Sequence, residues 1–150
     1  MKVGFSDSRI FRPLATVLKL FYFLLIYFME QKKFDLQERL IDFSIAIMEI
    51  SESLHSTFAS KHIGGQLLRS GTSPALNYGE AQSAESPADF VHKMKVCLKE
   101  LRETLIGLKI ISKKPLTNNL EIVNKSSVEC NELISIFVKS IQTANKNRQN

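Results

Sequence analysis

Tryptophan is absent from this sequence of 150 residues, and cysteine (two residues) and histidine (three residues) are rare. Two cysteines cannot build a disulfide scaffold. Cys97 and Cys130 both fall on predicted core positions, where a thiol behaves as a small apolar group. We therefore expect reduced thiols and a cytoplasmic protein. His55, His62 and His92 belong to no Glu-x-x-His or Cys-x-x-Cys pattern, so the sequence predicts neither a metal site nor a bound cofactor.

Paired catalytic groups are also missing from the sequence. No serine, lysine or cysteine stands beside an evident base at a predicted helix start. Glu80 is a lone acid between Asn77 and Gln82, a setting in which an acid usually stabilises its helix. We therefore expect no enzymatic activity.

What is present is the composition of one globular domain. Hydrophobic residues make up 44% and charged residues 23% of the chain, which is enough apolar side chain to build a core. The formal charge is +5 and is unevenly placed. Residues 1–29 hold four basic side chains against one acid, and residues 30–150 hold 16 against 14. The weak positive charge of the longer part suggests an anionic partner, with an ordinary mixed surface as the alternative.

Residues 1–28 form a hydrophobic N-terminal extension of unusual composition. Residues 20–29 are all apolar, and the apolar stretch reaches back to Leu14 with interruptions at Thr16 and Lys19. A membrane-spanning helix needs about 20 apolar residues, so residues 14–29 are an inner-membrane anchor in one interpretation. A secretory signal is a second interpretation, although no cleavage site follows. In the third, Met29 is the natural start and residues 1–28 result from a misplaced start.

Helical periodicity follows Phe34 almost everywhere, and no alternating strand pattern is convincing. We predict helices over residues 36–58, 61–84, 86–112 and 120–144, with a frayed tail at 146–150. Ser86, Pro87 and Asp89 give a strong start to the third helix. Pro74 should kink the second helix, and Asn77 should bind a carbonyl group that the proline frees. The short connections predict an all-α, antiparallel up-down-up-down four-helix bundle over residues 34–145.

The spacing of apolar residues also predicts the core. One inward-facing row is expected on each helix. The predicted rows are Leu36, Leu40, Phe43, Ile47, Ile50, Leu54 and Phe58; Leu67, Leu68, Leu76, Tyr78, Ala81 and Ala84; Phe90, Met94, Cys97, Leu101, Leu105, Leu108 and Ile111; and Leu120, Val123, Ser127, Cys130, Ile134, Phe137, Ile141 and Ala144.

Two further groups of residues lie away from these rows. Five basic residues of the third helix fall within an arc of about 80° and would complement a phosphate backbone: Lys95, Lys99, Arg102, Lys109 and Lys113. A plain solvated face is the alternative. Five apolar residues also point outward and suggest contact with another subunit, or else a wider core: Ile41, Ile45, Met48, Ile106 and Ile110.

Three short stretches carry a family resemblance. They are Arg69-Ser70 followed by Ser-x-x-x-Asn-x-x-Glu, a Ser-x-x-Asp-Phe helix start, and Leu-Lys-Glu with a further glutamate. Over residues 34–145 this pattern resembles the bacterial four-helix bundle proteins encoded in intervening sequences of 23S rRNA genes. The motif residues are Arg69, Ser70, Pro74, Asn77, Glu80, Asp89, Phe90, Lys99, Glu100 and Glu103.

The resemblance implies a function without catalytic residues. The family is similar to the accessory variability determinant of diversity-generating retroelements, a basic pentamer of four-helix bundles that binds nucleic acid and a reverse transcriptase. It therefore implies a homo-oligomer, with the pentamer as precedent, and RNA or DNA as partner. This chain is less basic than that relative. A protein-interaction module without nucleic-acid binding, tethered to a membrane through residues 14–29 in one version, remains the alternative.

Overall fold

The computed structural model describes residues 17–25 and 35–147. The chain divides into two compact units, residues 1–36 and 37–150. Within the first unit, residues 17–25 form a helix whose side chains are exposed. No helix in the described part of the chain is long and apolar enough to cross a membrane. The other positions of the 14–29 segment, and the rest of the 1–28 extension, lie outside the described residues.

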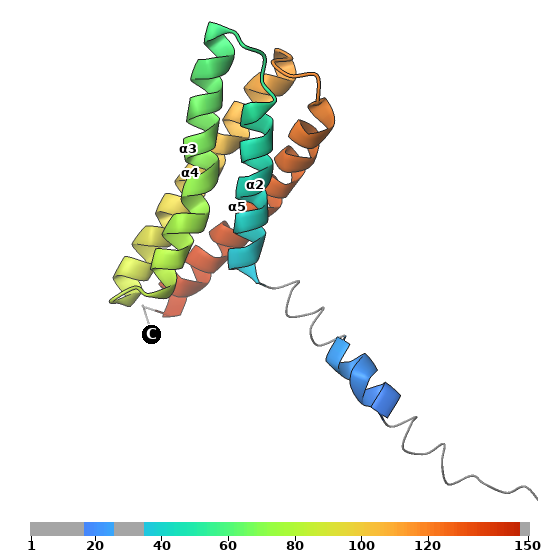
Figure 1. Cartoon of the computed structure of the whole chain (residues 1–150). Coiled ribbons are helices and arrows are strands. Elements are labelled where there is room, and N and C mark those ends of the chain that lie inside the picture. The colour runs from blue at the N-terminus through green and yellow to red at the C-terminus, as the bar shows by residue number, and fades with distance from the viewer. Residues whose placement is uncertain (1–16, 26–34, 148–150) are drawn as a thin grey trace, which may run out of the picture. The chain divides into compact units, whose positions relative to one another are not determined.

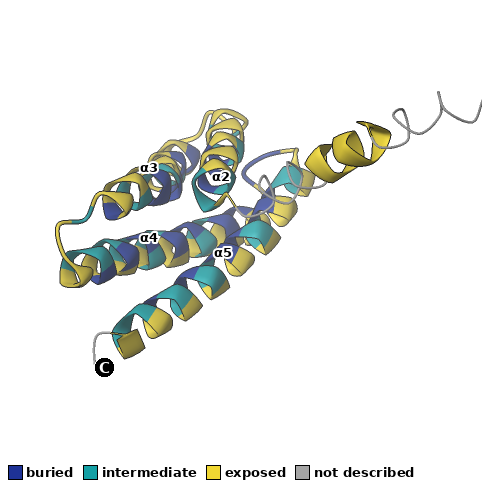
Figure 2. Cartoon of the chain, turned by 90° about the horizontal axis from the view of Figure 1, so that it is seen from below, coloured by how far each residue is buried: buried dark blue, intermediate teal, exposed yellow. Residues whose placement is uncertain are grey.

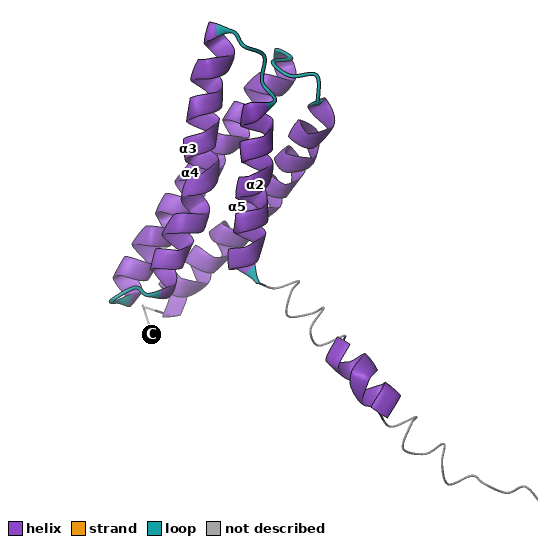
Figure 3. Ribbon diagram, in the orientation of Figure 1, coloured by secondary structure: helices purple, strands orange, loops and turns teal. Residues whose placement is uncertain are grey.

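The second unit is built from four long helices: α2 (Leu36–Glu52), α3 (Phe58–Gln82), α4 (Pro87–Lys113) and α5 (Leu120–Asn147). They run up, down, up and down, so that each is antiparallel to the next (Figure 1). The described residues contain five helices and no strand (Figure 3). The prediction of an all-α protein is therefore confirmed, and the four helices of the second unit are those of the predicted bundle.

The first connection differs from the prediction. We expected one helix from Leu36 to Phe58, but α2 ends at Glu52 and a loop of five residues follows. Thr57 then caps α3, because its side-chain oxygen accepts a hydrogen bond from the backbone N–H of Ser60 at 3.1 Å. Phe58, predicted as core, is 90% exposed. Because the helix ends at Glu52, the apolar spacing that continues in the sequence to residue 58 no longer turns Phe58 toward the core.

Pro74 lies inside α3, which is continuous on both sides of it. A proline removes the hydrogen bond to the carbonyl group four residues earlier, here that of Ser70. Asn77 does not take that place: its Nδ2 donates to the carbonyl oxygen and to Oγ of Ser73, both at 2.9 Å. Our prediction for Asn77 was therefore wrong, because the amide reaches only its own preceding turn. The bend at Pro74 stays a prediction.

The start of α4 confirms the capping prediction. Oγ of Ser86 accepts a hydrogen bond from the N–H of Asp89 at 3.1 Å, and Asp89 accepts one from the N–H of Glu85 at 3.3 Å. Pro87 is the first helical residue, where its missing N–H costs nothing. These local signals fix the start of the helix that carries the basic residues.

The buried residues, dark blue in Figure 2, lie along the sides of the helices that face one another and form the core. Leu76 is 70% exposed, and its neighbour Ala75 is buried instead. In α5, Ser127 and Ile134 were predicted as core but are only half-buried, and their neighbours Ser126 and Leu133 are buried instead. Residues three and four positions after a buried residue lie about 60° and 40° from it on opposite sides of the helix, so either can face the core.

Two contacts place α2 between α3 and α5. A Cβ atom at Gly71 of α3 would lie 2.5 Å from Cγ2 of Ile47, so the absence of a side chain lets the two helices approach closely. On the other side, Arg39 forms a hydrogen-bonded ion pair with Glu129 of α5 and a second with Glu132, and these raise its pKa. Because α4 packs against both α3 and α5, α2 and α4 occupy diagonal positions in the bundle.

Candidate nucleic-acid interface and motif residues

The outer face of α4 carries the five predicted basic residues, and all five are exposed. One helix of 27 residues holds them, so their spacing is fixed by the helical repeat. Nζ of Lys99 lies 3.0 Å from a carboxylate oxygen of Glu100, and this hydrogen bond raises the pKa of Lys99. The helical repeat places Glu100 about 100° from Lys99, yet its carboxylate reaches back and partly neutralises one of the five charges.

Two of the predicted interface residues share this face. Ile106 and Ile110 are exposed, and at about 100° per residue Ile106 falls inside the basic arc and Ile110 at its edge. The two predictions therefore concern one surface, which we name the α4 outer face: Lys95, Lys99, Arg102, Ile106, Lys109, Ile110 and Lys113. A groove of about 310 Å³ runs beside it between α3 and α4, and its walls include Ile63, Ile106 and Ile110.

The remaining interface residues lie on α2. Ile41, Ile45 and Met48 are between 37% and 48% exposed, so they are not part of a wider core. Their neighbours on the helix surface include the exposed acids Asp42, Glu49 and Glu52. We name these six residues the α2 outer face.

Motif residues of α3 serve the interior of the bundle. Ser70 and Pro74 are buried, and the hydroxyl group of Ser70 is hydrogen-bonded to that of Thr104 in α4 at 3.0 Å. Sγ of Cys97 donates to the carbonyl oxygen of Pro74 at 3.5 Å. Arg69 is exposed. The central part of the motif is therefore explained by packing between α3 and α4.

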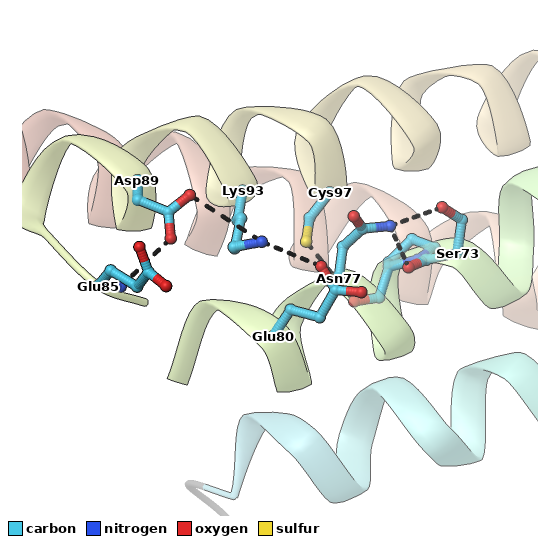
Figure 4. Close-up of polar contacts among 8 residues, drawn as sticks. Ser73, Asn77, Glu80, Glu85, Asp89, Lys93 and Cys97 are labelled. Atoms are coloured by element: carbon cyan, nitrogen blue, oxygen red, sulfur yellow. Dashed lines mark hydrogen bonds and ion pairs between the residues drawn. The ribbon is translucent and has the colours of Figure 1, made fainter. Parts of the chain in front are cut away.

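A second group of motif residues meets at the turn between α3 and α4 (Figure 4). Nζ of Lys93 lies 3.0 Å from a carboxylate oxygen of Glu80 and 3.9 Å from one of Asp89. The hydrogen bond to Glu80 raises the pKa of Lys93. Sequence analysis missed Lys93, although its position four residues after Asp89 is the spacing of a helical ion pair. Glu80 and Asp89 thus hold one lysine between two helices.

Two other motif residues, Glu103 and Phe90, lie elsewhere on α4. Glu103 is exposed and lines the groove between α3 and α4. Phe90 is half-buried at the start of α4.

The three histidines are exposed, and the described residues hold no group of three side chains that could bind a metal ion. Nothing in this part of the structure assigns a cofactor-binding residue.

Both thiols lie inside the bundle. Cys97 and Cys130 are buried and unpaired. Burial raises the pKa of each to about 12, so both are protonated at neutral pH and poor nucleophiles.

Comparison with known proteins agrees with the motif residues. The model of the 23S rRNA-intervening sequence protein family matches residues 32–139. A crystal structure of a protein of unknown function from the S23 ribosomal protein family of Bacteroides thetaiotaomicron VPI-5482 is 27% identical, with a TM-score of 0.63. The match covers 70% of this chain and 96% of that one. No curated protein matches at a significant level. Sequence motif, bundle and family match agree: the chain belongs to the 23S rRNA-intervening sequence protein family.

Proposed function

We propose that this protein is a non-enzymatic bundle that self-associates and binds RNA or DNA through the α4 outer face. The observation that carries the proposal is the set of five exposed basic side chains on one side of a single helix. Like charges on one helix face repel slightly and do not stabilise the helix. The phosphate backbone of a nucleic acid is the anionic partner that best matches such a row of cations.

The amount of charge favours contact with the nucleic-acid backbone over base recognition. Of the five cations, Lys99 is paired with Glu100, which leaves four for phosphate contacts. Lysine and arginine on an exposed convex face reach phosphate oxygens, which fix position but carry no sequence information. We therefore propose binding with little sequence preference and strong dependence on salt.

The second candidate function is a protein-interaction module without nucleic-acid affinity. The exposed Ile106 and Ile110 favour it, because they interrupt the basic face with apolar surface that phosphates do not need. The membrane-tethered version depends on residues 14–29, of which the structure describes only residues 17–25. Both candidates agree on a protein without catalysis, and they differ in whether a polyanion binds.

A titration with fluorescent single-stranded RNA and DNA separates the two candidates. The variant Lys99→Glu/Arg102→Glu should lose binding, because two cations of the α4 outer face become anions. Lys139→Glu/Lys146→Glu has the same net charge, but its changes lie on exposed positions of α5, so it should retain most of the wild-type affinity. If the wild type binds neither polymer at low salt, the protein-interaction function replaces the proposed one.

A further inference from the structure

The α2 outer face combines apolar and acidic side chains. Ile41, Ile45 and Met48 are exposed beside Asp42, Glu49 and Glu52. Over its whole length α2 has four acids against one arginine, a formal charge of −3. That arginine, Arg39, is held by Glu129 and Glu132 of α5. The α2 outer face is therefore an apolar strip flanked by negatively charged carboxylates.

The α4 outer face has the opposite charge and a similar apolar strip. α4 contains six lysine and arginine residues against three acids, a formal charge of +3. Ile106 and Ile110 lie among these cations, and the groove beside them offers about 310 Å³ with Ile63 on its far wall. An isoleucine or methionine side chain from a neighbouring helix would fit such a groove.

These two faces cannot meet within one molecule. α2 contacts α3 through Gly71 and α5 through Glu129, while α4 lies between α3 and α5 on the far side. The two outer faces therefore point away from each other. Within the four-helix bundle, neither face covers the other.

We propose that the α2 outer face of one copy docks on the α4 outer face of a second copy, head to tail. The acids of α2 then lie opposite the bases of α4, and the two apolar strips meet. Asp42 to Glu52 spans about 15 Å and Lys99 to Lys113 about 21 Å along their helices, so the acidic face fits within the length of the basic one. Two α2 faces or two α4 faces would repel, which excludes a two-fold contact through either face alone.

The energetic roles of the two components differ. Exposed ion pairs contribute little to affinity because water and salt screen them, so the affinity comes from the apolar strips. The charges select the partner face and its orientation. Because each copy contributes one face of each kind, the contact is heterologous and continues from copy to copy until a ring closes or a filament forms.

This inference rests on the self-association part of the proposed function and adds a consequence for the other part. The same α4 face would bind either a second copy or a polyanion. The structure therefore assigns a competition: nucleic acid should release copies from one another, and self-association should weaken nucleic-acid binding at high protein concentration.

The experiment uses two complementary variants of the full chain and measures their mass in solution by sedimentation velocity. Glu49→Lys/Glu52→Lys leaves two bases and one acid on the α2 face, which becomes basic. Arg102→Glu/Lys109→Glu/Lys113→Glu leaves three acids and two bases on the α4 face, which becomes acidic. Each variant alone then presents two faces of the same sign and should be monomeric. When they are mixed in equal amounts, every contact again joins opposite charges, so the oligomer should reappear. Lys139→Glu/Lys146→Glu should keep the wild-type mass.

Distinct results would overturn each proposal. A monomeric wild type, or a mixture that stays monomeric while both variants show native circular dichroism, would overturn the head-to-tail contact. The proposed function is read separately, because Glu49→Lys/Glu52→Lys leaves the α4 face intact and should bind RNA at least as tightly as the wild type. A wild type that forms the oligomer, together with a monomeric Glu49→Lys/Glu52→Lys variant that binds no RNA at low salt, would contradict the nucleic-acid proposal alone.

Discussion

The hydroxyl groups of Ser70 in α3 and Thr104 in α4 are hydrogen-bonded to each other at 3.0 Å inside the bundle. Both residues are almost fully buried, and Thr104 also lies 2.8 Å from the carbonyl oxygen of Glu100. A buried hydroxyl group without a partner is costly, so the pair ties the register of α3 to that of α4. This gives Ser70 a structural role within the motif.

The stabilities lost on removing the two hydroxyl groups of this pair should not be additive. Ser70→Ala or Thr104→Val removes the bond between the helices, while the remaining hydroxyl group keeps its bond to a carbonyl oxygen of its own helix, that of Glu100 or Leu67. We therefore expect each variant to lower the free energy of unfolding by about 0.5–1.5 kcal/mol. The double variant should be less destabilised than the sum of the two single variants. Urea denaturation of all four proteins measures this coupling, and strict additivity would show that the hydroxyl groups act independently.

Two glycines of α3 give a matched pair of substitutions with opposite expected signs. Gly71→Ala puts a Cβ atom 2.5 Å from Cγ2 and 3.0 Å from Cβ of Ile47, so we expect a loss of about 1–3 kcal/mol from overpacking. Gly65→Ala meets nothing within 4 Å and should stabilise the helix by up to about 1 kcal/mol. Thermal unfolding compares them, and equal effects would contradict the close approach of α2 and α3.

Ile45→Glu should move the protein toward the monomer without loss of helicity. Ile45 is 48% exposed on the α2 outer face, so a charge there is solvated in the monomer but buried in the proposed contact. Val128→Glu on α5 is the control, because Val128 is exposed outside both outer faces. Light scattering after size exclusion gives the mass. A Ile45→Glu variant that unfolds would place Ile45 in the core, and one with unchanged mass would remove α2 from the interface.

The buried thiols should make the protein less stable at alkaline pH. The pKa of Cys97 and of Cys130 is raised by burial from 9.0 to about 12. Between these values the unfolded chain loses the thiol protons while the folded chain keeps them, so stability falls as pH rises above 9. At pH 10 we expect a loss of about 1 kcal/mol for each thiol. Urea denaturation from pH 8 to 10 should show a smaller decrease in Cys97→Ala/Cys130→Ala, and equal decreases would contradict this.

Local signals in the sequence predicted most of the fold. Ser86, Pro87 and Asp89 marked the start of α4, and the apolar spacing from Met94 to Ile111 gave its inward side. The loop after Glu52 was missed because the apolar spacing continues through Leu54 to Phe58. A capping residue at Thr57 was the available sign of the break.

Signals local to one helix also predicted part of the candidate site. Side chains on one helix, such as Lys95 to Lys113, follow from the helical repeat, and that arithmetic could also have placed Ile106 among them. Contacts between helices could not be found that way. The pairing of Arg39 with Glu129 joins residues 90 positions apart, and a single sequence carries no signal for it.

The dependence of RNA affinity on salt, compared between the wild type and the single variants Lys109→Gln and Lys113→Gln, tests the central claim most directly. Each phosphate contact contributes about one unit to the slope of log affinity against log salt. If the α4 outer face binds the backbone, each variant should lower the slope by about one unit, whatever the RNA sequence. Slopes equal to that of the wild type in both variants would show that the α4 outer face does not contact nucleic acid.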